Sequence, residues 1–199
     1  HLPAPLRSAN TQAAAIQTDD LALLSATQVA AIGTSAFSAL SAGVITALNT
    51  AQVAALTSAQ LRSLGTAAIV ALETNDLNAL GTHQVAALKI DQVAALNTVQ
   101  LSALGDTQLT ALSTAQLGAI APADLAKLST AQFAALTQAQ VAALTTAQVA
   151  GMETADFAAL TVTQVPKLST AAIAALTDPL ITAFNTAQLQ ALQANQLKS

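Results

Sequence analysis

An eight-residue pattern repeats from Ala9 to Leu192 without an insertion or deletion, giving 23 consecutive blocks. We number the positions of each block as slots 1 to 8, so that Ala9 is the first slot 1. Slot 5 is apolar in every block, slot 8 is Leu in 18 blocks, and slot 7 is Ala in 18. Slot 4 is Gln in 14 blocks and Asp in four, and slot 2 is Thr in 13. A period this short must be explained before any fold is assigned.

The period of eight excludes one long helix and one long strand. An α-helix turns about 100° per residue, so an eight-residue repeat drifts by about 80° per block and its apolar stripe would wind around the helix. In a strand, slots 5 and 8 would face opposite sides of the sheet, and Ala and Gln are poor strand formers. The pattern therefore predicts one short helix, about six residues long, and one tight turn per block.

The polar slots agree with this interpretation, and two slots can supply the helix N-cap. Thr, Ser, Asp or Asn occupies slot 2 in 17 blocks. A Ser or Thr in slot 1 lies three residues before the slot 4 Gln, which is the spacing of a capping box. Both alternatives start the helix at the same place. Slot 1 also contains Gly and Asn, which are typical of helix ends in a left-handed conformation, at Gly33, Gly65, Gly81, Gly105, Asn49, Asn97 and Asn185.

Charges and prolines follow the same boundaries. All ten acidic residues lie in slots 1 to 4, and five of the six basic residues lie in slots 6 or 7, as the helix dipole favours. Pro122 and Pro179 lie in slots 2 and 3, where the first turn of a helix tolerates proline. Pro166 lies in slot 6, inside the expected helix, where proline costs about 3 kcal/mol or forces a kink.

A single block cannot fold alone, because burying two apolar side chains offsets less than the conformational entropy of ordering eight residues. The blocks must stack so that slots 5 and 8 share a core, which predicts an all-α solenoid of short helices. We expect an N-terminal segment at 1–8, one solenoid domain at 9–192 and a truncated repeat at 193–199. The number of octads per coil stays open, because no superperiod of 16 or 24 is clear.

Composition narrows the function classes. The chain has no Cys, and therefore no disulfide or thiolate metal site. Polar residues interrupt every apolar stretch, so we expect no membrane insertion. A net charge of −4, without Trp, Tyr or a basic cluster, argues against nucleic acid as a partner.

No group of residues points to catalysis, a metal or a cofactor. His83 lies in variable slot 3 and has no second group to assist it, so we expect a solvated surface histidine. Asp19 and Asp20 fall in first-turn slots, where helix capping is the simpler explanation than cation binding. Met152 and Phe184 replace the slot 8 Leu and should pack in the core.

The blocks LSTAQFAALTQAQVAALTTAQVAGMETADFAAL (128–160) resemble the TAQVAAL octapeptide arrays of large secreted surface exoproteins of Proteobacteria, often labelled haem utilisation or adhesion. The resemblance covers residues 9–192. It implies an extracellular, cell-surface location and a structural or adhesive role. It transfers no haem site, because the chain has no CxxCH motif and both His83 and Met152 are isolated.

Two functional hypotheses follow. The first is a rigid stalk or self-associating fibre or adhesin segment, which contacts other copies end to end or laterally, or a cell-surface partner. Val44 and Leu180 replace the slot 4 Gln and are our candidates for self-association. The alternative is a binding surface for ice or another ordered ligand, made of stacked slot 2 threonines, although capping would also explain these residues. They are Thr18, Thr34, Thr50, Thr66, Thr74, Thr82, Thr98, Thr114, Thr130, Thr146, Thr154, Thr170 and Thr186.

Overall fold

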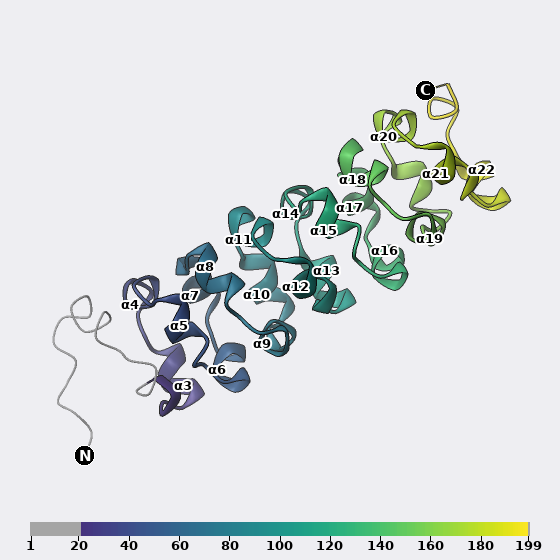
Figure 1. The fold of residues 1–199 in the computed structure, drawn as a ribbon. Coiled ribbons are helices and arrows are strands. Elements are labelled where there is room, and N and C mark those ends of the chain that lie inside the picture. Colours follow the sequence, from purple (N-terminus) through teal and green to yellow (C-terminus); the bar gives the residue numbers. More distant parts are fainter. Residues whose placement is uncertain (1–20, 199) are drawn as a thin grey trace, which may run out of the picture. The chain divides into compact units, whose positions relative to one another are not determined.

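The computed structural model describes residues 21–198, and these residues form short helices joined by tight turns (Figure 1). They contain no strand. Their contacts divide into two compact units, the first ending at Ala95 and the second beginning at Leu96. The all-α prediction is therefore confirmed for the described residues. The prediction of one domain over 9–192 stays a prediction, and the expected segment at 1–8 lies outside the described residues.

Each block of the first unit from 25–32 onward forms one helix. The helices are α3 (Ala26–Ala30), α4 (Thr34–Ser38), α5 (Ala42–Ile45), α6 (Thr50–Ala54), α7 (Ser58–Ser63), α8 (Thr66–Val70), α9 (Thr74–Ala79), α10 (Thr82–Ala87) and α11 (Ile90–Ala94). They contain between four and six residues, close to the predicted length.

The second unit follows the same rule with one exception. Its α-helices are α12 (Thr98–Ala103), α13 (Asp106–Ala111), α14 (Thr114–Gly118), α15 (Pro122–Leu125), α16 (Thr130–Ala135), α17 (Gln138–Ala142), α18 (Thr146–Ala150), α19 (Thr154–Ala158), α20 (Thr170–Ala174), α21 (Asp178–Thr182) and α22 (Thr186–Ala191). The block at 161–168 forms instead the 3-10 helix η1 (Val165–Lys167).

Proline explains the exception. Pro166 has no N–H to give to the carbonyl four residues earlier, so an α-helix through this block would lose a hydrogen bond. The Lys167 N–H donates to the Gln164 carbonyl, three residues earlier, at 2.8 Å, which is the bond of a 3-10 helix. The sequence predicted a kink or a costly helix at Pro166, and the chain changes helix type there.

The N-cap is in slot 1 for all helices α3 to α22, so the slot 1 alternative is the correct one. Ser129, for example, has an extended backbone, and its side chain accepts the N–H of Gln132 in the first turn of α16. The slot 2 threonines are consequently the first helical residues and not N-caps. The prediction that slot 1 Gly and Asn end helices in a left-handed conformation is wrong. Gly65 has φ −73° and Asn49 has φ −80°, both extended, because each begins the next helix.

Slots 5 and 8 form the core, as the repeat predicts. Leu61 and Leu64 of one block are 0% and 2% exposed, and both slots are buried in every block from 33–40 to 161–168. The last three blocks are less buried, with Ile181 and Leu189 in slot 5 at 49% and 46% exposure. Within each unit a helix packs on the third helix along the chain, as α3 does on α6 and α13 on α16. Side-chain contacts between coils join residues 25 to 31 positions apart. One coil therefore takes between three and four octads, which the sequence left open.

The truncated repeat at the C-terminal side begins like a complete one. The Gln196 and Leu197 N–H groups both donate to the Gln193 carbonyl, which forms a helical turn. The Gln196 side chain accepts the Gln193 N–H at 2.8 Å, as a slot 4 Gln does elsewhere. Among residues 21–198, no helix has both the length and the apolar character needed to cross a membrane.

Candidate functional site

The slot 4 glutamines make the most specific polar contacts in the structure, because most of them lie buried between coils of the solenoid. Gln92 and Gln148 are 0% exposed, and ten further glutamines of this slot are also buried. Their position follows from the helix, because slot 4 precedes the buried slot 5 and points toward the preceding coil. A buried amide must find hydrogen-bond partners for its oxygen and both of its N–H groups.

Gln148 shows how these partners are supplied. Its side-chain oxygen accepts the backbone N–H of Thr145, which begins the same block, at 3.0 Å. Its Nε2 donates to two carbonyls of the preceding coil, Leu117 at 3.0 Å and Ile120 at 2.8 Å. One amide thus closes the capping box of its own helix and bonds slots 5 and 8 of a block four repeats earlier. We call this arrangement the Gln bridge.

The Gln bridge recurs through both units. In the first unit Gln60 bonds the carbonyls of Val29 and Ile32, and Gln92 bonds those of Leu61 and Leu64. In the second unit Gln140 bonds those of Leu109 and Leu112. Further bridges with the slot 8 carbonyl bond at 2.6–2.8 Å are made by Gln52, Gln84, Gln132, Gln164, Gln188 and Gln196.

Aspartate at slot 4 makes a different contact between coils. Asp76, only 7% exposed, accepts a hydrogen bond from the hydroxyl of Thr50, 26 residues earlier, at 2.9 Å. Asp124 accepts one from Thr98 at the same separation. An ionised carboxylate cannot donate to a carbonyl, so these two aspartates use the slot 2 hydroxyl of an earlier block instead.

The third described slot 4 aspartate, Asp156, lies near an exposed ion pair. Lys127 Nζ and Glu153 Oε1 are 2.9 Å apart and also 26 residues apart in sequence. The hydrogen bond and the charge of Glu153 raise the pKa of Lys127. Burial raises the pKa of Asp156, and the charge of Glu153 raises it further while Lys127 opposes both.

The two residues proposed for self-association occupy this same buried slot. Leu180 is 2% exposed and Val44 is half-buried. Leu180 therefore replaces a bridging amide with apolar packing in its own unit, and its side chain is not available to another chain in this structure. Self-association through Val44 stays a prediction.

The other candidates lie in different blocks of the repeat. His83 is exposed, as predicted, and Met152 is buried at 5% exposure. Phe184 is half-buried and packs edge to face on the buried Phe157, with ring centroids 4.9 Å apart. Asp19 and Asp20 lie outside the described residues.

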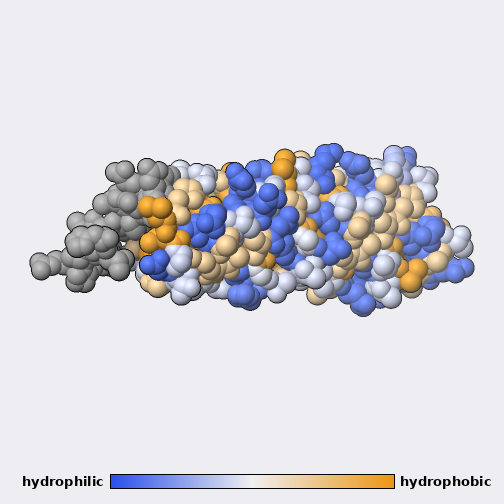
Figure 2. Space-filling view, turned by 90° about the horizontal axis from the view of Figure 1, so that it is seen from below, coloured by the Kyte–Doolittle hydropathy of each residue, from blue (hydrophilic) through white to orange (hydrophobic). Residues whose placement is uncertain are grey.

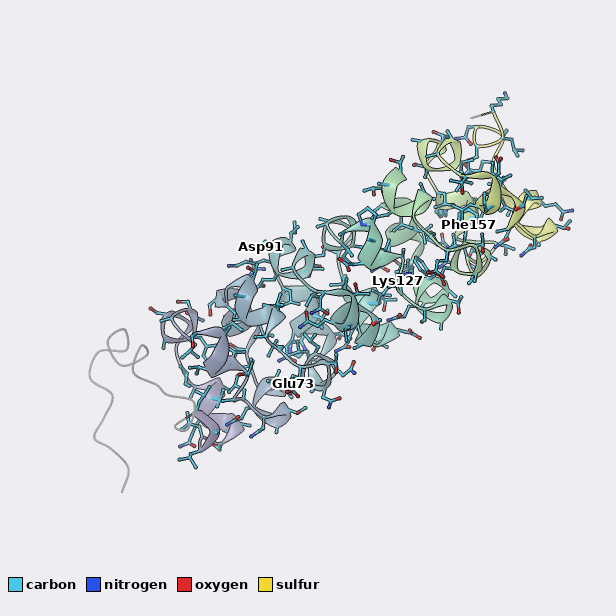
Figure 3. All side chains as sticks on the ribbon, viewed as in Figure 1. Glu73, Asp91, Lys127 and Phe157 are labelled. Atoms are coloured by element: carbon cyan, nitrogen blue, oxygen red, sulfur yellow. The ribbon has the colours of Figure 1, made fainter. Side chains whose placement is uncertain are left out.

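The acidic side chains that the structure describes do not gather into a metal site. Glu73 and Asp91 appear at opposite edges of the first unit (Figure 3). Within residues 21–198, no three His, Cys, Asp or Glu side chains form a group that could hold a metal ion.

Sequence reasoning identified the capping half of the Gln bridge and missed the half that joins coils. Its signal was present in the array, because Gln fills slot 4 in 14 of 23 blocks, directly before an apolar slot. A capping role alone tolerates many residue types. A buried residue that must donate twice and accept once is restricted to an amide.

A family model for the ALTTAQ repeat matches the chain six times. The six letters occur at residues 143–148 and correspond to slots 7, 8, 1, 2, 3 and 4, with the bridging Gln148 as the last. No curated protein and no solved structure matches the chain. The family matches cover residues 13–50, 29–66, 53–89, 69–105, 117–152 and 149–186. The chain therefore belongs to the ALTTAQ repeat family.

Proposed function

We propose that this chain is a structural, non-catalytic repeat module of a secreted bacterial surface protein, acting as a rigid stalk or as a self-associating fibre or adhesin segment. One observation carries the proposal. Twelve slot 4 glutamines are buried, and the slot 4 polar side chains bond to the backbone or to a hydroxyl of a neighbouring coil, as Gln148 and Asp76 do. The slot 4 polar side chains therefore bond neighbouring coils of the repeat to one another.

The surface supports contact with other macromolecules through many weak interactions. Only 8% of the chain is charged, so electrostatic repulsion between copies is small. On the face in Figure 2, hydrophilic, neutral and mildly hydrophobic patches alternate, and the strongly hydrophobic ones are small. Such a surface suits lateral or end-to-end association of copies, or attachment to a cell-surface partner.

Negative-stain electron microscopy of the purified chain over a concentration series tests the structural role. A self-associating fibre segment gives filaments of constant width that lengthen with concentration. A stalk gives discrete particles of one size at all concentrations. Irregular aggregates at every concentration would contradict both forms of the proposal.

A second experiment tests location. In a bacterium that encodes this chain, protease is added to intact cells and the chain is followed with an antibody. Loss of the chain without loss of a cytosolic marker supports a cell-surface position. Full protection of the chain until the cells are lysed overturns it.

Self-association through Val44 has a direct test. Val44→Gln should lower the weight-average sedimentation coefficient at high concentration, because it removes apolar surface from a half-buried position. The matched variant Ala51→Gln changes an exposed slot 3 residue of the next block and should leave sedimentation unchanged. Equal sedimentation of Val44→Gln and the unmodified chain removes Val44 as a contact.

One observation favours the alternative function, a threonine surface for ice or another ordered ligand. Since slot 1 provides the N-caps, capping does not explain the slot 2 threonines, and ten of them are exposed. They are Thr34, Thr50, Thr66, Thr82, Thr114, Thr130, Thr146, Thr154, Thr170 and Thr186. The coil register weighs against a flat ladder, because Thr50 contacts the slot 4 side chain of Asp76 and not another slot 2 threonine. Inhibition of ice recrystallisation by the purified chain would establish the alternative.

A further inference from the structure

Two stretches of the array whose preceding coil the structure describes lack the Gln bridge in two successive blocks. A third stretch, 33–48, also lacks a slot 4 Gln, at Ala36 and Val44, but the residues at bridge spacing before it, 5–16, lie outside the described residues. The first unbridged segment is 65–80, where slot 4 is Ala68 and then Asp76. The second unbridged segment is 169–184, where slot 4 is Ala172 and then Leu180. One lies in each unit, and both have bridged blocks on either side.

At the first unbridged segment, two backbone carbonyls of the preceding coil lack the donors that a Gln bridge would supply. By the spacing of the other bridges, Ala68 and Asp76 stand where amides would reach the slot 8 carbonyls of Leu40 and Leu48. These carbonyls accept no hydrogen bond from the described residues, although Leu40 and Leu48 are only 8% and 4% exposed. The Asp76 carboxylate instead accepts a single hydrogen bond from the Thr50 hydroxyl.

The second unbridged segment repeats this arrangement. Ala172 and Leu180 are buried, at 0% and 2% exposure, but neither side chain can donate a hydrogen bond. Met152 and Leu144 are the corresponding slot 8 residues below, and their carbonyls accept no hydrogen bond from the described residues. On either side, Gln164 and Gln188 bond the slot 8 carbonyls of Leu136 and Leu160 at 2.7 Å.

Bridged and unbridged blocks therefore differ in the hydrogen bonds that must break when a block separates from the preceding coil. Opening a bridged block breaks two hydrogen bonds from a buried amide and exposes that amide. Opening an unbridged block breaks no hydrogen bond from a buried amide, and in 65–80 it breaks only the single bond from Thr50 to Asp76. It exposes to water carbonyls that lacked a partner. Slots 5 and 8 are buried in 65–80 as in the bridged blocks beside it, so the difference in opening free energy there lies in slot 4. In 169–184 the slot 5 residue Ile181 is 49% exposed, and the bridged block that follows is similar, with Leu189 at 46%.

We propose that residues 65–80 and 169–184 are built-in yielding segments, at which the coils of each unit separate first under thermal motion or load. A yielding segment lets a repeat module lengthen locally while the bridged blocks keep their structure. The proposal concerns the opening of the fold and does not depend on where the chain is located or whether it self-associates.

Hydrogen–deuterium exchange of the full chain, read by mass spectrometry of peptides, tests the proposal. Backbone amides of 169–184 should exchange about tenfold faster than those of 185–198, whose blocks carry the bridges of Gln188 and Gln196. Simple fraying from the chain end predicts the opposite order, because 185–198 is nearer the C-terminus. Slower exchange in 169–184 than in 185–198 overturns the proposal.

The variant Ala172→Gln supplies the missing amide and should slow exchange in 169–176 about tenfold. Its matched control is Ala171→Gln, which adds the same amide at exposed slot 3 and should leave exchange unchanged. Equal exchange in the two variants contradicts the role of slot 4. If the larger side chain of Ala172→Gln disturbs packing, the exchange rates of 169–184 and 185–198 in the unmodified chain still test the proposal.

Discussion

At slot 4 a single amide side chain must satisfy three backbone groups at once. Gln has two N–H donors and one acceptor in a plane at the end of a three-carbon stem, and the structure uses all of them in Gln148. Glutamate has the same length but no donor, and asparagine is one carbon shorter. The three described slot 4 aspartates do not imitate the Gln bridge, and two of them use a threonine hydroxyl instead.

Removing one Gln bridge should have a large effect for a single side chain. We expect Gln148→Ala to lower the free energy of unfolding of the second unit by about 2–4 kcal/mol, because it leaves buried backbone groups without partners. Urea unfolding followed by circular dichroism at 222 nm measures the change. The control is Gln138→Ala, at exposed slot 2 of the preceding block, which should change stability by less than about 0.5 kcal/mol. Similar losses in the two variants would mean that the bridge contributes little.

Asp156 gives stability a defined pH dependence. Folding raises the pKa of its carboxyl, chiefly by burial, so its ionised form is disfavoured in the folded chain. Its contribution is most favourable below the unfolded pKa of about 3.9 and is lost as the pH rises through the raised folded pKa. Asp156→Asn should therefore be more stable than the unmodified chain at pH 7, and the two should converge near pH 3. Urea midpoints across this range check the prediction, and a gain that is the same at both pH values would exclude ionisation as its cause.

At the scale of one helix, the cap decides how a block begins. Sequence reasoning placed the start of the α-helices near the block boundary but could not choose between slots 1 and 2 for the N-cap, because Ser and Thr are good N-caps in either slot. It did not predict that the helix at 161–168 begins only at Val165. The buried Gln decides the choice, since its side chain accepts the slot 1 N–H in blocks such as 129–136. The slot 1 glycines were misinterpreted because Gly is common both at helix ends and at N-caps.

Gly65→Ser tests the corrected role of slot 1. Gly65 has φ −73°, which any residue can adopt, and an added Cβ would meet nothing within 4 Å. In the block at 169–176 a Ser in the same slot caps an otherwise similar helix, accepting the Ala172 N–H at 3.0 Å. We expect Gly65→Ser to raise the free energy of unfolding by about 0.5–1 kcal/mol, measured by urea unfolding. Destabilisation would instead indicate a left-handed backbone at Gly65.

Pro166→Ala should convert the one exceptional block to the common form. Alanine restores an N–H that can bond the carbonyl of Val162, four residues earlier, and it has the highest helix propensity. We expect η1 to become an α-helix, with a gain in stability of about 1–3 kcal/mol and more ellipticity at 222 nm. The control Ala174→Gly, at an exposed slot 6, should lose about 1 kcal/mol. An unchanged spectrum and midpoint for Pro166→Ala would mean that tertiary packing, and not proline, imposes the 3-10 helix.

For the whole molecule, local rules in the sequence predicted the helices and their buried slots but not how the coils stack. Slots 5 and 8 are defined within one block, so their burial follows from a pattern of eight residues. The coil is set by contacts such as that of Gln60 with Val29, 31 residues apart, between a side chain and backbone carbonyls. Every residue has a backbone carbonyl, so the sequence does not show which carbonyls accept a hydrogen bond from a distant side chain. The buried role of Leu180 was missed for the same reason.

This use of backbone acceptors makes the array tolerant of whole-octad deletions. If residues 137–144 are removed, Gln148 meets the carbonyls of Leu109 and Leu112, which are again slots 5 and 8 and now serve Gln140. Every later block shifts by one repeat and finds the same slots below it. We expect this deletion to fold, with a urea midpoint close to that of the full chain.

Deleting half an octad, 137–140, is the matched control. Gln148 would then face Ser113 and Gln116, and polar slots would replace the apolar slots 5 and 8 throughout the contact between coils. This smaller deletion should therefore abolish the cooperative transition of the second unit, although it removes half as many residues. Equal stability of the two deletions would show that the coils do not depend on the register that the Gln bridge sets.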